Sequence, residues 1–128
     1  MKTRKYAKTL CLCVLALALF VSTASAVTST LTASAYGGTQ NSGKVTKTTS
    51  GNPSMHVDSI SGMSQSYFWC RLRCGSSAAT PAYKFTSTGS KNMYYLSGQG
   101  NVNDKIFVRI QTHADEPNAV TAKLTWTP

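Results

Sequence analysis

Short runs in which hydrophobic and polar residues alternate recur along the chain. The clearest is residues 105–111, where Ile106, Val108 and Ile110 would share one face of a strand and the residues between them the other. Residues 118–127 repeat this pattern and contain threonine, valine and tryptophan, which favour strands. Both segments are therefore predicted to be half-buried β-strands.

Turn-forming residues separate these runs from weaker ones. The sequence Ser-Gly-Gln-Gly-Asn at 97–101 and the sequence Asp-Glu-Pro-Asn at 115–118 predict turns on either side of the 105–111 strand. No segment shows a sustained helical stripe, and a single helical turn at 78–83 is disfavoured by Pro81. Further strands are predicted at 45–49, 55–60, 65–73, 83–86 and 93–96.

The first 26 residues have the features of a secretory signal peptide. Four basic residues lie between positions 2 and 8, twelve apolar residues follow at 10–21, and Ala24-Ser25-Ala26 supplies the small residues that signal peptidase requires. The apolar run is shorter than the roughly 20 residues of a membrane-spanning helix. We therefore expect cleavage after Ala26 and a secreted protein without a transmembrane helix in its mature chain, with association to the cell envelope left open.

The mature chain divides into two parts by composition. Residues 27–43 are rich in Ser, Thr, Ala and Gly and have few apolar residues, so they are predicted to form a flexible arm, with an added first strand as the alternative. Residues 44–128 are predicted to form one all-β domain. Five to seven short strands in this length indicate an antiparallel β-sandwich or a small barrel.

The charge balance favours anionic partners. The whole chain has 13 Lys and Arg residues against 4 Asp and Glu residues. Loss of the four basic residues of the signal peptide leaves nine against four, a net charge of +5. A mature chain of roughly 100 residues also excludes a large multidomain enzyme.

Basic and aromatic residues share one face of the strand predicted at 65–73. Alternation places Phe68, Cys70 and Leu72 on a core face and the residues between them on the opposite face. A neighbouring strand could add Lys105, Phe107 and Arg109. Such a surface suits polyanions, although the aromatic rings could instead fill space between sheets and the cations could serve solubility alone. The predicted binding face comprises Tyr67, Trp69, Arg71, Arg73, Lys105 and Arg109.

Cys70 and Cys74 are the only cysteines outside the signal peptide. Outside the cell a disulfide between them is expected. An extended strand would hold their Cα atoms about 13 Å apart, whereas a disulfide needs less than about 7 Å. A disulfide therefore requires a bend that would push Arg71 and Arg73 outward, and whether the two cysteines pair with each other stays open.

The sequence has no motif of a known enzyme class. It lacks a Gly-x-Ser-x-Gly elbow, a His-Glu-x-x-His motif and a phosphate-binding glycine loop. His56 and Asp58 would share a strand face, but a triad is recognised by geometry and not by composition. The four carboxylates are interpreted as solvated surface groups. We therefore predict neither an enzyme nor a bound metal or cofactor, and the spacing of Cys70 and Cys74 with His56 and His113 is not typical of zinc.

Several short motifs give the chain a resemblance to a group of bacterial proteins. They are the signal segment, Tyr67-Phe68-Trp69, Gly89-Ser90-Lys91 leading into Tyr94-Tyr95, and Leu124-Thr125-Trp126. With these motifs the chain resembles the small uncharacterised secreted β-domain proteins of Gram-positive bacteria. The resemblance implies a bacterial, secreted origin.

Three functions are compatible with these features. The first is a non-enzymatic secreted domain that binds a polyanionic envelope component or a partner protein through its basic and aromatic face; nucleic acid is a less favoured ligand. The second is a small secreted toxin or bacteriocin-like effector. The third is an exported enzyme inhibitor that presents the segment from Cys70 to Cys74 as a constrained loop.

Overall fold

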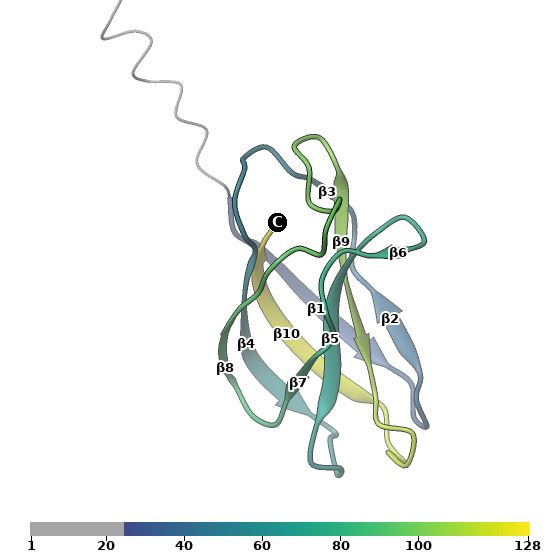
Figure 1. Cartoon of the computed structure of the whole chain (residues 1–128). Helices are drawn as coiled ribbons and strands as arrows, with labels where there is room; N and C mark the ends of the chain where they lie inside the picture. The colour runs from purple at the N-terminus through teal and green to yellow at the C-terminus, as the bar shows by residue number, and fades with distance from the viewer. Residues whose placement is uncertain (1–24) are drawn as a thin grey trace, which may run out of the picture.

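The computed structural model describes residues 25–128 (Figure 1). The predicted signal peptide therefore lies outside the described residues, except for its last two positions. The described part is all-β, as predicted, and contains no helix. Accordingly, it has no helix of the length and hydrophobicity that crossing a membrane requires.

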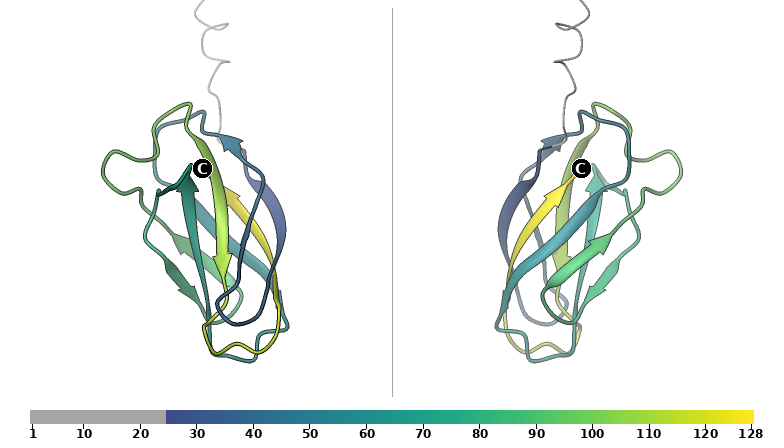
Figure 2. Two further views of the ribbon diagram at one scale, coloured as in Figure 1. Left: turned by 90° about the vertical axis from the view of Figure 1, so that its right-hand side faces the viewer. Right: turned by 90° about the vertical axis from the view of Figure 1, so that its left-hand side faces the viewer.

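The strands form two antiparallel sheets, which Figure 2 shows as two layers. One sheet has the order β1-β10-β4-β8, and the other has the order β2-β9-β5-β6, with β3 also paired to β9 and β7 to β5. The strands are β1 (Val27–Ala33), β2 (Thr39–Asn41), β3 (Val45–Thr46), β4 (Ser54–Ser61), β5 (Phe68–Cys74), β6 (Ser77–Ala78), β7 (Tyr83–Phe85), β8 (Gly89–Asn92), β9 (Lys105–Gln111) and β10 (Val120–Thr127).

The hydrophobic core takes alternate residues from both sheets. Leu124 and Trp126 of β10 are buried together with Leu72 of β5 and Val108 of β9. The intervening residues of β5 and β10 are less buried and face outward, as the two-residue period requires. Burial of these side chains is the main favourable contribution to folding.

The strongest patterns gave the most accurate strand predictions. The predicted segment 105–111 is confirmed as β9, and 118–127 contains β10. The strand predicted at 93–96 is wrong, because the chain forms β8 just before this segment. Within residues 93–96, only Met93 is buried deeply in the core. Residues 25–128 contain ten strands, more than the five to seven expected, because pairing partners extend over residues with little hydrophobic pattern.

The flexible arm predicted at 27–43 is wrong, because this segment contains β1 and β2. The alternative, an added first strand, describes it correctly. Leu31 and Ala33 are buried, and β1 pairs along its whole length with β10, from Val27 opposite Trp126 to Ala33 opposite Val120. The composition suggested a flexible arm because half of the side chains of β1 face solvent. The segment nevertheless forms a strand because β10 provides hydrogen-bond partners for its backbone.

Adjacent residues of β1 provide a test of this assignment. Leu31→Ala is expected to destabilise the protein by about 2–5 kcal/mol, because it opens a cavity in the core. Thr30→Ala, on the exposed face, should change stability by no more than about 0.5 kcal/mol. Urea unfolding followed by circular dichroism measures both. Equal, negligible effects would mean that this segment is not packed against the core.

The disulfide predicted between Cys70 and Cys74 is also wrong, since both cysteines are free. β5 runs without a bulge from Cys70, opposite Ile110, to Cys74, opposite Ile106. The strand therefore does not make the bend that a disulfide would need. Instead, the buried Cys70 Sγ lies 3.1 Å from Met55 Sδ, and burial raises the pKa of the Cys70 thiol.

Candidate functional site

The outer face of β5 and β9 brings three arginines together. In the antiparallel register, Arg71 lies directly opposite Arg109, while Trp69 lies opposite Gln111. Arg73 follows two residues along β5 and so projects on the same side. The predicted division of β5 into a core face and an outer face is confirmed, because Phe68, Cys70 and Leu72 are all buried.

Aromatic rings lie at one end of this row of arginines. The rings of Tyr67 and Trp69 meet edge to face, with centroids 5.4 Å apart. Lys84 of β7, which lies opposite Trp69, places its Nζ 4.4 Å from the Tyr67 ring centroid and 5.0 Å from that of Trp69. A lysine therefore already covers both rings through cation–π contacts.

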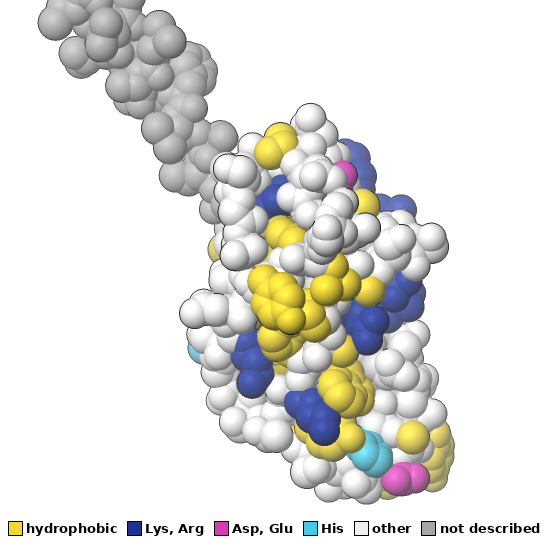
Figure 3. Space-filling view, in the orientation of Figure 1, with side chains coloured by type: hydrophobic (Ala, Val, Ile, Leu, Met, Phe, Trp, Pro, Cys, Tyr) yellow, Lys and Arg dark blue, Asp and Glu magenta, His cyan; other side chains and the backbone are white. Residues whose placement is uncertain are grey.

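We call this surface the basic-aromatic face. Figure 3 shows Lys and Arg side chains beside hydrophobic ones on the side of the molecule that carries β5 and β7. Five of the nine basic residues in 27–128 belong to this face. It consists of Tyr67, Trp69, Arg71, Arg73, Lys84, Lys105 and Arg109.

The cations of this face bind neutral groups and not carboxylates. Arg109 Nε donates to Asn41 Oδ1 at 2.8 Å, Lys105 Nζ donates to Thr46 Oγ1 at 2.5 Å, and Arg73 donates to the carbonyl oxygen of Ser76. Within residues 25–128, the ion pairs are two contacts between a histidine and an aspartate, and neither includes Lys or Arg. The positive charge of the face is therefore not neutralised by the protein.

The arginines also disfavour one another. Partial burial, then the charge of Arg73 and then that of Arg71, lower the pKa of Arg109 from its ordinary value. Like charges directly opposite each other on a sheet are destabilising. The arrangement costs stability, and an anion placed between the guanidinium groups would remove this cost.

The structure differs from the sequence-based expectation for this face in two respects. Phe107, expected to add a stacking surface, lies opposite Arg73 but is only 5 % exposed, so it offers no ring to a ligand. Lys84 was missed. Alternation within residues 83–86 does place it on an outer face, but only the pairing of β7 with β5 places it beside Trp69.

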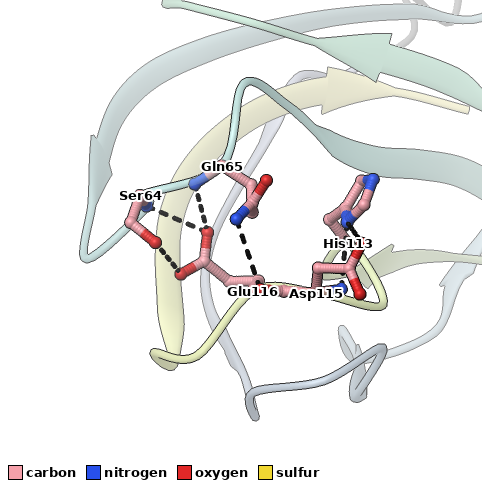
Figure 4. A network of polar contacts seen from close by, with 5 residues as sticks. All are labelled: Ser64, Gln65, His113, Asp115 and Glu116. Atoms are coloured by element: carbon pink, nitrogen blue, oxygen red, sulfur yellow. Dashed lines mark hydrogen bonds and ion pairs between the residues drawn. The ribbon is translucent and has the colours of Figure 1, made fainter.

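A buried carboxylate holds the loops at the aromatic end of the face (Figure 4). Glu116 is 1 % exposed, so its interpretation as a solvated surface group is wrong. It accepts hydrogen bonds from the backbone and hydroxyl of Ser64 and from the backbone of Gln65 and Asn118, at 2.7–3.2 Å. These contacts join the turn before β5 to the loop that carries His113, whose ring packs against Tyr67 at 5.0 Å.

The Glu116 contacts predict a loss of stability in acid. Burial would raise the pKa of this carboxyl, but hydrogen bonds from Gln65, Ser64 and Asn118 lower it to about 2, from an ordinary value of 4.5. A depressed folded-state pKa gives stability that is complete above the unfolded-state value. The contribution of Glu116 should therefore be lost as the pH falls from about 4.5 towards 2.

Unfolding measured between pH 2 and pH 6 tests this expectation. Glu116→Gln should lower stability at neutral pH and flatten the dependence in this window, because the amide cannot replace the carboxylate towards several donors. Asp115→Asn is the control, because the Asp115 side chain is 82 % exposed. An unchanged pH profile in Glu116→Gln would contradict the role of the carboxylate.

The described residues contain no group of three or more His, Cys, Asp or Glu side chains that could hold a metal ion. His113 contacts Asp115 and Tyr67, while His56 lies on the other sheet. The guanidinium and ammonium groups of the face can attract an anion and donate hydrogen bonds to it. Comparisons of the chain with protein-family models, with curated proteins and with solved structures found no match.

Proposed function

We propose that this protein is an exported β-sandwich, released from a signal peptide at residues 1–26, that binds a polyanionic component of the cell envelope through its basic-aromatic face. The observation that carries the proposal is the group of Arg71, Arg73 and Arg109 on one surface, where no carboxylate of residues 25–128 forms an ion pair with them. Guanidinium groups donate several hydrogen bonds in a planar fork that matches a phosphate.

The aromatic end of the face favours a ligand without nucleobases. A nucleic acid bound to such a surface gains much of its affinity by stacking bases on exposed rings. Here Lys84 covers Tyr67 and Trp69, so stacking would first displace this lysine. A phosphodiester polymer of an envelope requires only the cations, and Lys84 would add one more.

The continuous strand β5 also separates the binding hypothesis from the inhibitor hypothesis. The inhibitor hypothesis requires a projecting, constrained loop between Cys70 and Cys74, whereas these residues lie in the continuous strand β5. No specific contact favours the toxin hypothesis. A long polyanion lying across β9 and β5 would contact the arginines of both strands.

Binding to poly(glycerol phosphate), measured by calorimetry over a range of salt concentrations, tests the proposal. We expect the logarithm of the affinity to fall linearly with the logarithm of the salt concentration, with a slope of about −2 if the three arginines each contact one phosphate. Poly-lysine is the control and should not bind. Absence of salt-sensitive binding would contradict the proposal, and tighter binding of single-stranded DNA would assign the face to nucleic acid instead.

A further inference from the structure

A second group of polar side chains lies on the outer face of the other sheet. In the register of this sheet Thr125 lies opposite His56, and His56 lies opposite Ser90. Ser90 Oγ is 2.7 Å from His56 Nδ1. On the other side of the ring, His56 Nε2 is 3.6 Å from Asp58 Oδ1, and Thr125 Oγ1 donates to Asp58 Oδ2 at 2.7 Å. A serine, an imidazole and a carboxylate thus follow one another in contact.

A β-bulge positions the carboxylate of this group. Leu124 pairs with Val57 and Lys123 pairs with Ser59, so Asp58 is an extra residue in β4. The bulge leaves both Asp58 and Ser59 exposed and returns Ile60 to the core side. Bulges turn individual side chains in this way and are common beside active sites. The Thr125 hydrogen bond then holds Asp58 next to His56.

We propose that Ser90 is a nucleophile that accepts acyl groups from small carboxylic esters, with His56 as its general base and Asp58 as a positioning residue. The Ser90 oxygen attacks the ester carbonyl while its proton passes to His56 Nδ1. The ester C–O bond then breaks, and the imidazole returns the proton to the leaving alcohol. Water hydrolyses the acyl-serine by the same steps. Asp58 favours the tautomer with its proton on Nε2, which leaves Nδ1 free to accept.

The surroundings of Ser90 suit a small substrate. Ser90 and Lys91 line two hollows of about 220 and 210 Å³, one bordered by Thr125 and Trp126 and the other by residues 85–89. One hollow would hold the acyl group and the other the alcohol. β8 is an edge strand, so part of its backbone N–H groups are unpaired and available to a developing oxyanion.

Covalent labelling of the whole protein tests the proposal directly. A fluorophosphonate probe forms a bond between Ser90 Oγ and phosphorus, releases fluoride and transfers the serine proton to His56. Peptide mass spectrometry is expected to place the label on Ser90, and the same protein should hydrolyse p-nitrophenyl acetate. The exposed Ser59 of β4 lies outside both hollows and is the matched control, so Ser59→Ala should leave both readouts unchanged.

Three variants separate catalysis from structure. Ser90→Ala should abolish the label, and His56→Gln should slow labelling by about 100-fold or more, as removal of a general base does. Asp58→Asn should slow it by about tenfold, with partial rescue by Asp58→Glu. Labelling of Ser59 as fast as Ser90, or labelling of Ser90 that is unaffected by His56→Gln, would overturn the proposal.

The test is independent of the proposed polyanion binding. The two sites lie on the outer faces of different sheets, so poly(glycerol phosphate) binding should be unchanged in these three variants and in Asp58→Glu. The thermal unfolding temperature verifies that each variant is folded, whether or not the polymer binds. Slowed labelling in a variant whose unfolding temperature is unchanged supports the proposal, and recovery of the rate in Asp58→Glu provides the decisive comparison.

Discussion

Replacing Arg71 and Arg109 together with glutamine is expected to weaken polyanion binding and to stabilise the fold at the same time. Each arginine that contacts a phosphate contributes about 1.5–3 kcal/mol, so the affinity at low salt should fall about tenfold or more for each residue. The slope of the salt dependence should become shallower by about 1.4. Removal of the opposed charges should stabilise the sheet by up to about 1 kcal/mol.

A matched pair of lysines distinguishes this face from net charge. Lys91 and Lys123 lie on strands of the other sheet, and their replacement by glutamine changes the net charge by the same amount. Calorimetry and thermal unfolding of both double variants give the comparison. An equal loss of affinity in the two double variants would show that binding follows the overall charge. A lower stability of the arginine double variant would show that repulsion between Arg71 and Arg109 does not destabilise the fold, so that no ligand is needed to offset it.

Replacing Trp126 with alanine should have the largest effect on stability. The Trp126 side chain is 1 % exposed, and its Nε1 donates to Ser29 Oγ at 3.2 Å, which ties β10 to β1. Loss of a buried tryptophan destabilises by about 3–5 kcal/mol, and a domain of this size has a total stability of about 5–15 kcal/mol. The variant should therefore lose a large part of its total stability.

Urea unfolding followed by far-ultraviolet circular dichroism measures this effect without the tryptophan signal. Trp126→Phe retains most of the buried surface and should cost much less than the alanine variant. Ser29→Ala isolates the hydrogen bond, with an expected cost of about 1 kcal/mol. A loss below about 1 kcal/mol in Trp126→Ala would show that the two sheets do not pack around this side chain.

Segments with both strong alternation and a buried partner could be predicted from the sequence. β9 was predicted with its correct ends because hydrophobic and polar residues alternate strictly across its length. β1 was given only as the alternative to a flexible arm, and β8 was not predicted. The outward residues of these two strands are Ser, Thr, Lys and Asn, which are also the residues of loops. Their strand conformation follows from pairing with β10 and β4, which no local pattern records.

The candidate sites show the same division. The face of β5 that carries Arg71 and Arg73 follows from alternation, and this prediction is confirmed. The contact of Lys84 with the rings follows from the order of strands in the sheet. The Ser90–His56–Asp58 group depends on the pairing of β4 with β8, which brings together residues 34 positions apart, and on the bulge in β4. The residue types alone therefore could not distinguish this group from a chance occurrence of serine, histidine and aspartate.

The sequence by itself determined the strand class, the division of β5 into inner and outer residues, and the excess of positive charge, because each is a local property of neighbouring residues. Only the tertiary structure decided which strands pair, and hence that Arg71 opposes Arg109, that Cys70 stays free and that Glu116 is buried. The physical reason is that backbone hydrogen bonding between strands is nearly independent of sequence, so register and strand order depend on how the whole core packs.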